Sequence, residues 1–296
     1  MTSSAGGDGF DGEVPTSKGI GTLFPANDSE PILASPTPMR PTPTKARLAK
    51  AAGNASRART MSRLQRALDS MWMAFQPIVD TTRGRVFGYE ALMRNEEGSL
   101  WEPGEVLAVA ERLGRLRELG RRTRTLAAQA FTHAHPSAVL FVNLHTLDLN
   151  DPALYEANAP LTKMAGRVVL EITERASLAE VEDLPARLKD LRRHGFRVAI
   201  DDLGAGYAGL SAVVSLEPEF VKLDMFLVRN IHECRTRQRL IATIMSFRKG
   251  LDMNVIAEGV ELPAECRQLQ GLECRLMQGF LFARPGPPFP AVESFS

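Results

Sequence analysis

From about residue 70 onward, the sequence alternates short apolar runs with longer amphipathic stretches. Eight runs have the length and the β-branched or aromatic content of strands: AFQPIV (74–79), RVFGYEALM (85–93), AVLFVNL (138–144), RVVLEI (167–172), RVAID (197–201), FVKLD (220–224), NVIAE (254–258) and LMQGFLF (276–282). Helical patterns, such as 103–134 and 181–195, lie between most of them. This alternation is typical of parallel α/β architecture, and eight strands in about 220 residues predict a (β/α)8 barrel of the TIM type.

One connection does not fit a fully parallel barrel. Only DTTRG (80–84) separates the first two runs, and it ends at a turn-forming glycine. A parallel crossover needs about a dozen residues, so these two strands are expected to form an antiparallel hairpin. The prediction is a modified barrel with an antiparallel first strand.

The first part of the chain has a different composition. Residues 1 to about 45 are rich in Gly, Ser, Thr and Pro, which predicts disorder. The stretch 45–68 contains seven basic residues and no acidic one. A basic helix that contacts nucleic acid, anionic lipid or a partner is one interpretation, and a solvated linker that becomes helical near the domain is the preferred one. We therefore expect a disordered, then basic tail or linker over 1–68 and one domain over 69–296.

The bulk composition excludes several classes of protein. The formal net charge is +1, so overall charge predicts no partner. The three cysteines show no CxxC spacing, and the N-terminus lacks the pattern of a signal peptide, so a reduced, cytoplasmic protein is expected. No apolar run reaches the roughly 18 residues of a membrane span.

Polar residues end or interrupt seven successive predicted strands, from the second to the eighth. They are Glu90, Asn143, Glu171, Asp201, Asp202, Lys222, Asp224, Glu258 and Gln278. In a barrel these strand ends converge on one mouth, where such folds keep their chemistry. A buried polar group without a partner costs about 2–7 kcal/mol, so the repetition over seven strands indicates a functional site.

The residue types at this mouth indicate a metal. The hard oxygen donors are Glu90, Asn143, Glu171 and Asp201. They suit Mg²⁺, Mn²⁺ or Ca²⁺ better than zinc, which prefers His or Cys. Asp202 and Glu258 could complete a second metal site, and paired metals are a usual device for phosphodiester hydrolysis. Lys222 would orient the attacking water or neutralise developing charge.

Longer motifs resemble one known family. They are FQPIVD (75–80), GYEALMR (88–94), FVNL (141–144), LEITER (170–175), AIDDLGAGYAGL (199–210), VKLD (221–224), IAEGVE (256–261) and QGFLFARP (278–285). In this order and spacing they are similar to the EAL-domain cyclic di-GMP phosphodiesterases, over about 72–288. The resemblance implies a (β/α)8 barrel with an antiparallel first strand. It also implies bacterial signalling through hydrolysis of cyclic di-GMP to linear pGpG, with Mg²⁺ or Mn²⁺, in a two-metal site.

The resemblance also assigns roles to residues. The implied metal ligands are Glu90, Asn143, Glu171, Asp201 and, for a second ion, Asp202. The implied substrate contacts are Gln76, Leu92 and Arg94, with Arg94 on a phosphate. Lys222 and Glu258 would handle the nucleophilic water, with Glu258 as the base. Gln278 would support the site from the eighth strand, and Glu174 would pin the loop that begins at Asp202.

Other functions remain as alternatives. A non-hydrolysing cyclic di-GMP receptor or a protein-interaction module would typically have lost ligands, and this sequence keeps them all. A magnesium barrel enzyme acting on an enolate would also use carboxylates at strand ends, but it does not predict this motif order. Departures such as Leu203, Ala205 and Phe280 fall outside the ligand set. Barrels of this family often dimerise near the loop 202–210, so the resemblance implies a homodimer. No nucleic acid beyond the dinucleotide is expected as a partner.

Overall fold

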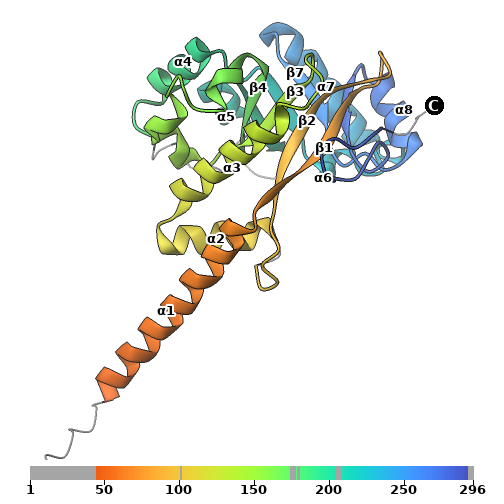
Figure 1. The fold of residues 1–296 in the computed structure, drawn as a ribbon. Coiled ribbons are helices and arrows are strands. Elements are labelled where there is room, and N and C mark those ends of the chain that lie inside the picture. Colours follow the sequence, from red (N-terminus) through yellow and green to blue (C-terminus); the bar gives the residue numbers. More distant parts are fainter. Residues whose placement is uncertain (1–44, 101, 174–177, 179–180, 205–208, 293–296) are drawn as a thin grey trace, which may run out of the picture. The chain divides into compact units, whose positions relative to one another are not determined.

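The computed structural model describes residues 45–292, apart from 101, 174–177, 179–180 and 205–208. Within these ranges eight strands form a closed barrel in sequence order (Figure 1). Their bounds are β1 Trp72–Asp80, β2 Arg85–Arg94, β3 Val139–Asn143, β4 Val168–Thr173, β5 Arg197–Leu203, β6 Phe220–Leu223, β7 Asn254–Ala257 and β8 Leu276–Gln278. The predicted barrel is confirmed.

The first strand runs against its neighbours, as the short connection predicts. β1 pairs antiparallel with both β2 and β8, and all other neighbouring strands pair parallel. β2 and β3 approach closely, because a Cβ at Gly88 would lie 2.3 Å from the Val139 carbonyl oxygen. β8 is shorter than predicted and ends at Gln278, because Gly279 packs against the Val260 backbone and the chain turns there.

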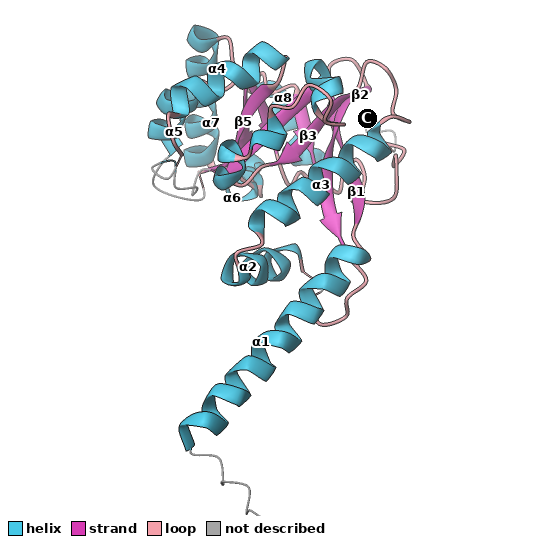
Figure 2. Cartoon of the chain, turned by 60° about the vertical axis from the view of Figure 1, so that its left-hand side comes forward, coloured by secondary structure: helices cyan, strands magenta, loops and turns pink. Residues whose placement is uncertain are grey.

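Helices surround the strands in the described part of the chain (Figure 2). The α-helices are α1 Lys45–Asp69, α2 Pro103–Leu113, α3 Leu116–Phe131, α4 Leu184–His194, α5 Gly209–Leu216, α6 Met225–Val228, α7 Arg235–Leu251 and α8 Pro263–Gly271. Short 3-10 helices are η1 Thr146–Asn150, η2 Pro152–Leu154, η3 Thr162–Arg167 and η5 Ile231–Glu233. The helical pattern over 103–134 divides in two, because Gly114 adopts a left-handed conformation (φ 69°) that caps α2.

The end of α1 packs as part of the domain. The chain divides after Leu48 into two units, and the features described below belong to residues 49–296. Leu64, Ala67 and Leu68 are buried in a cluster with apolar residues of α2 and α3. Outside this cluster Arg66 pairs with Glu97 at 2.7 Å. The last turns of α1 therefore cover the surface formed by α2 and α3.

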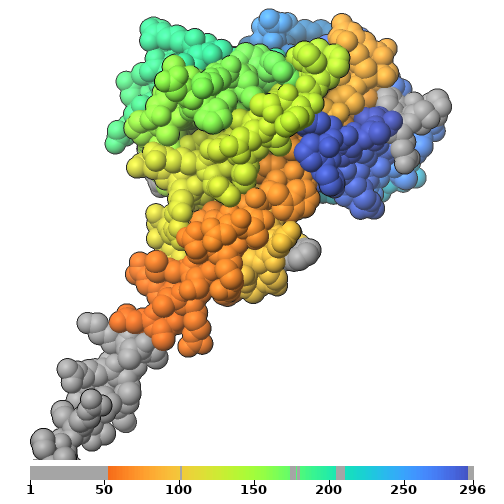
Figure 3. Space-filling view, viewed as in Figure 1, coloured from red at the N-terminus to blue at the C-terminus, as the bar shows by residue number. Residues whose placement is uncertain are grey.

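The C-terminal segment covers the outer face of β1. Phe75 and Gly286 exchange two backbone hydrogen bonds, of 2.7 and 3.1 Å. The Phe289 ring lies 4.8 Å from the rings of Phe75 and Tyr89 and 6.0 Å from that of Phe131. Figure 3 shows this segment, in dark blue, against the orange β1–β2 region and the yellow-green α3. It seals a flank that the antiparallel first strand leaves without a crossover helix.

An apolar layer fills the interior of the barrel. Its buried members are Ile78, Val139, Phe141, Val169, Ala199, Phe220, Ile256 and Leu276. The rings of Phe141 and Phe220 pack edge to face at 5.3 Å, which closes the centre. Burial of each large side chain contributes about 1.5–3 kcal/mol. This layer, called the apolar floor below, lies directly beneath the polar residues of the mouth.

Candidate functional site

The polar layer lies one pleat above the apolar floor. Side chains on a strand alternate between two faces, so the residue two positions after an inward-facing one also faces inward. Six floor residues of parallel strands are followed at this spacing by Asn143, Glu171, Asp201, Lys222, Glu258 and Gln278. Glu90 of β2 and Gln76 of β1 sit opposite each other in the strand register and complete the ring. The two-residue repeat of the strands therefore places polar residues from all eight strands at one mouth of the barrel.

Lys222 is the centre of this ring. Its side chain is 1% exposed, and its Nζ lies 2.7 Å from Glu258 Oε1 and 2.8 Å from Glu171 Oε1. The same nitrogen lies 3.0 Å from Asp201 Oδ1 and 3.3 Å from Glu90 Oε2. One buried ammonium group thus faces four carboxylates from four different strands.

Burial and the neighbouring charges act in opposite directions on the pKa values of these residues. Burial opposes the charge of Lys222, but the surrounding carboxylates outweigh it and raise its pKa well above the usual range. Burial raises the pKa of Glu171 well above its usual range and that of Glu258 to about 8, although Lys222 opposes both shifts. Lys222 therefore stays charged, while negative charge on the buried carboxylates is unfavourable, a cost that a further cation would lower.

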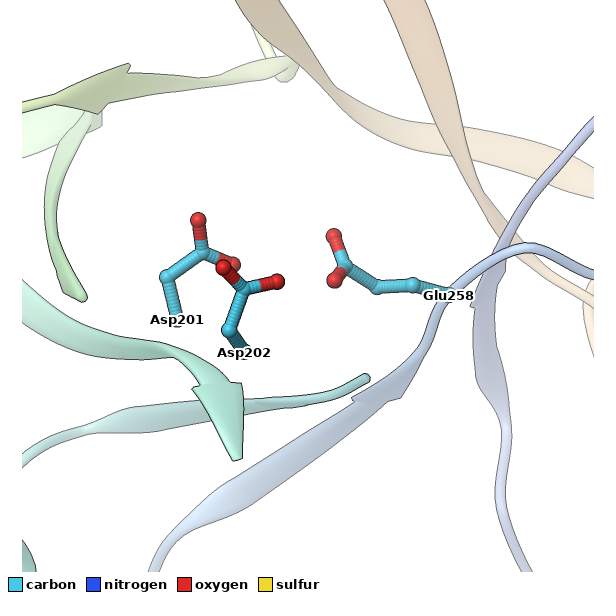
Figure 4. Close-up of side chains that lie close together, drawn as sticks. All are labelled: Asp201, Asp202 and Glu258. Atoms are coloured by element: carbon cyan, nitrogen blue, oxygen red, sulfur yellow. The ribbon is translucent and has the colours of Figure 1, made fainter. Parts of the chain in front are cut away.

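Asp201, Asp202 and Glu258 form a second grouping. One carboxylate oxygen from each lies within 4.8 Å of the others, and Figure 4 shows the two aspartates facing Glu258 across the mouth. Consecutive strand residues normally point to opposite faces. Asp202 adopts a left-handed conformation (φ 58°) beside a register shift between Ile200 and Leu203, so both aspartates reach the mouth. Burial, followed by the charges of Asp201 and Asp224, raises the pKa of Asp202 to about 6.

Amide side chains orient Glu90. Asn143 Nδ2 donates to Glu90 Oε1 at 3.0 Å, and Gln278 Nε2 donates to Glu90 Oε2 at 2.7 Å. Gln278 also donates to Gln76 Oε1 at 3.0 Å, and Gln76 donates to the Ala283 carbonyl at 3.1 Å. The predicted supporting residue of the eighth strand therefore links β1, β2 and β8.

The donor set fits a divalent cation. Glu171 Oε2 is buried without a hydrogen bond in the described part of the chain, and Glu171 Oε1 and Asp201 Oδ1 are buried against the Lys222 ammonium group. Five carboxylates surround one ammonium group, so the site has negative charge left to neutralise. Carboxylate and amide oxygens are the ligands that Mg²⁺, Mn²⁺ and Ca²⁺ prefer.

A cavity of about 610 Å³ opens beside Asn143 of the polar ring. Leu92, Arg94 and Asn143 line it from the strand side, and α2 and α3 form its other wall through residues such as Leu107 and Leu119. The Arg94 guanidinium group donates to the backbone carbonyl of the preceding residue, Met93, at 2.8 Å. Its other N–H groups are left for a ligand. Two of the three predicted substrate contacts thus share one cavity, while Gln76 lies in the polar ring.

Comparison with known proteins identifies the family. The model of the EAL domain matches residues 61–285, which is most of the chain. The chain belongs to the EAL domain family.

Several relatives of this EAL domain are named for an activity or have structures with a bound ligand. It is 29% identical over 232 residues to the probable cyclic di-GMP phosphodiesterase PdeI of Escherichia coli K12, covering 74% of this chain and 29% of PdeI. The calcium and cyclic di-GMP complex of Klebsiella pneumoniae BlrP1 matches with a TM-score of 0.66 and 34% identity, over 75% of this chain and 58% of that one. A standalone EAL protein of Vibrio cholerae bound to c-di-GMP matches with a TM-score of 0.63 and 30% identity, over 75% and 95%.

The first curated relatives are longer proteins. The chain spans 27%, 33% and 37% of the lengths of the first three that it matches. BlrP1 also has a manganese and cyclic di-GMP complex, so calcium accompanies the dinucleotide in one structure of that relative and manganese in another. In the described part of this EAL domain, no helix is long and apolar enough to cross a membrane.

Some expected residues have other positions. Glu174 and Ala205 lie outside the described residues. Asp224 caps α6 by accepting from the Phe226 N–H at 2.7 Å, and its charge contributes to the raised pKa of Asp202. Gly259, directly after Glu258, adopts φ 67° with its Cα against Met225, where a Cβ would lie 2.5 Å from the Met225 Cβ. This glycine lets the end of β7 turn beside α6.

The sequence analysis missed a buried ion cluster behind the cavity. Arg124 of α3 is 7% exposed and contacts Asp148 at 2.9 Å and Asp151 at 2.7 Å. Arg121 adds a contact of 2.6 Å to Asp151. Asp148 lines the cavity against Gly120, where no side chain would fit. The available signal was Arg124 at an otherwise buried position of the amphipathic helix α3.

Proposed function

We propose that this EAL domain hydrolyses cyclic di-GMP to linear pGpG with the help of Mg²⁺ or Mn²⁺. The observation that carries the proposal is the convergence of four carboxylates on Lys222, with Glu171 Oε2 buried without a hydrogen bond among the described residues. Complexes of BlrP1 with cyclic di-GMP and calcium or manganese support the choice of ligand and cation class.

The residues divide into two cation-holding groups. Those of the first group are Glu90, Asn143, Glu171 and Asp201, and those of the second are Asp201, Asp202 and Glu258. When bound, divalent cations supply charge stabilisation on the phosphodiester oxygens. Asn143 would hold a cation through its side-chain carbonyl oxygen, while its amide nitrogen donates to Glu90.

In the proposed reaction, Glu258 accepts one proton and Lys222 remains positively charged. A water oxygen attacks phosphorus and forms a new P–O bond, and Glu258 takes the proton that this water loses. Burial raises the pKa of Glu258 to about 8, and bound cations would lower it, so that this carboxylate would be ionised and free to accept the proton. Lys222 keeps a positive charge beside the phosphoryl oxygens, and the bond to the leaving 3′-oxygen breaks as that oxygen takes up a proton. The balance is cyclic di-GMP plus water giving pGpG.

Substrate contacts place the dinucleotide across the mouth. Arg94 would bind a phosphate through its planar guanidinium group, since this group pairs with phosphate in a forked geometry. Leu92 offers an apolar wall of the 610 Å³ cavity, which suits the face of a base. Gln76 would contact the substrate from β1, and Glu174 would hold the loop that starts at Asp202.

The test is turnover by the purified full chain with Mn²⁺ or Mg²⁺, against the same reaction in EDTA. The wild type should form pGpG only with the cation, and Glu90→Ala or Asn143→Ala should remove most of the turnover. Cyclic di-GMP binding without product would instead support a receptor, and turnover that survives both substitutions would contradict the ligand assignment.

Two further expectations remain predictions. A homodimer would give twice the mass of the chain in light scattering. A cytoplasmic location would agree with the three free cysteines. Loss of localisation on deletion of 1–68 would indicate a partner for the basic stretch.

A further inference from the structure

A second cavity lies at the end of the barrel opposite the mouth. It has a volume of about 460 Å³ and is lined by Thr82, Arg248, Gln270, Glu273, Cys274 and Arg275. These residues come from the β1–β2 turn, the ends of α7 and α8, and the residues that lead into β8 (Figure 1). β8 runs from this cavity to Gln278 at the mouth, so the two sites are separated by the apolar floor.

Two guanidinium groups line this cavity, and the charge of Arg248 also acts on Glu273 and Cys274 beside it. Arg248 Nε is buried without a hydrogen bond, and neither Arg248 nor Arg275 forms a side-chain hydrogen bond or ion pair with any described residue. Buried N–H groups are almost always satisfied, so an unpaired one in a polar cavity indicates a water or an ion that completes it. Guanidinium groups donate in a planar fork that matches phosphate oxygens.

The acidic groups nearby are already neutralised. Glu273 pairs with Lys249 at 2.8 Å, and Asp80, below the turn that carries Thr82, pairs with Arg83 at 3.3 Å. Burial raises the pKa of the Cys274 thiol to about 12, although the Arg248 charge opposes the shift, so this thiol is neutral. The cavity therefore keeps the positive charge of two arginines.

We propose that this cavity binds the phosphate group of a small anionic ligand, held between Arg248 and Arg275. The Gln270 side chain is exposed at the rim and adds an amide donor. The Thr82 hydroxyl is not counted as a donor, because it already donates to Asp80 at 2.6 Å. The volume exceeds the needs of a phosphate ion and lies in the range of small-molecule sites, so a phosphate monoester fits as well.

A simpler role for Arg248 is to complement the dipole of α7, whose last turn also carries Lys249. That role does not involve Arg275, which stands before β8 on a different element. Phosphate binding that depends on both arginines distinguishes the two roles.

The experiment is calorimetric titration of the full chain, in EDTA so that cations do not fill the mouth, with inorganic phosphate, GMP and guanosine. Arg248→Met and Arg275→Met should each weaken phosphate or GMP binding by at least about tenfold. Arg193→Met is the matched control, because Arg193 also lies in the last turn of a helix, α4, and it should bind like the wild type.

The ligands distinguish the source of the phosphate group. Tighter binding of GMP than of phosphate indicates a monoester, and equal affinities indicate free phosphate. The absence of binding at millimolar phosphate and GMP, equal binding by guanosine and GMP, or unchanged affinity in Arg275→Met would each overturn the proposal. Arg275 is exposed, so its variant keeps the test open should Arg248→Met fail to fold. Because the cavity is remote from the mouth, these outcomes do not depend on cyclic di-GMP hydrolysis.

Discussion

Replacement of Lys222 by methionine tests the electrostatic account of the mouth. The substitution keeps much of the side-chain volume but removes a charge that lies within 3.3 Å of four carboxylates. Removal of one partner from a buried ion pair costs about 3–5 kcal/mol. For a domain of this size, each kcal/mol lowers Tm by about 2–4 °C, so a fall of about 6–20 °C is expected in EDTA.

The loss should depend on pH and on cations. Glu258 has a pKa of about 8 with Lys222 present, and without Lys222 it rises further. A carboxyl whose pKa is higher in the folded than in the unfolded state binds a proton on folding, so the deficit of the variant should shrink as the pH falls from 8 to 6. A divalent cation at 100 times its Kd stabilises by about 2.7 kcal/mol, and it should raise the Tm of the variant more than that of the wild type.

Thermal unfolding of both proteins in EDTA and in Mn²⁺ measures these effects, with the exposed Lys189→Met of α4 as the control. A variant as stable as the wild type in EDTA at pH 8, or an equal gain in Tm from Mn²⁺ in both, would refute the reasoning.

Substitutions at three other positions have expected outcomes. Asp202→Asn should keep the stability within about 0.5 kcal/mol, since Asn tolerates the left-handed conformation, but should lose most turnover; Asp202→Ala should lose stability as well, and equal unfolding midpoints for the two would contradict this. Arg124→Met should cost about 3–5 kcal/mol by leaving Asp148 buried without its partner and Asp151 with Arg121 alone, as measured by urea unfolding; a loss below 1 kcal/mol would contradict it. Gly259→Ala should reduce kcat by moving the neighbouring Glu258, because its φ of 67° and the contact with α6 leave no room for a methyl group; normal kcat would show that the backbone there has no such role.

Much of the barrel could be predicted from local patterns. The connection 80–84 is too short for a crossover, and this alone determines the antiparallel β1–β2 pair. The period of two places Asn143 above Phe141 and Glu171 above Val169, so residues far apart in the sequence share one layer.

The remaining features depend on contacts between distant parts of the chain. The left-handed conformation of Asp202 reverses its side chain, and a strict strand period would have placed it away from Asp201. Likewise, the wall that α2 and α3 add to the cavity depends on how these helices pack, and the pairing of Arg124 with Asp148 joins residues 24 positions apart. Local propensity contains no information on such contacts.

The most direct test of the central claim is the fate of cyclic di-GMP with the wild-type chain and excess Mn²⁺, followed by chromatography. If the chain is a metal-dependent phosphodiesterase, cyclic di-GMP is lost with matching appearance of pGpG, and the reaction is stopped by EDTA and restored by added Mn²⁺. Cyclic di-GMP that binds but remains intact with Mn²⁺ and with Mg²⁺ would contradict it.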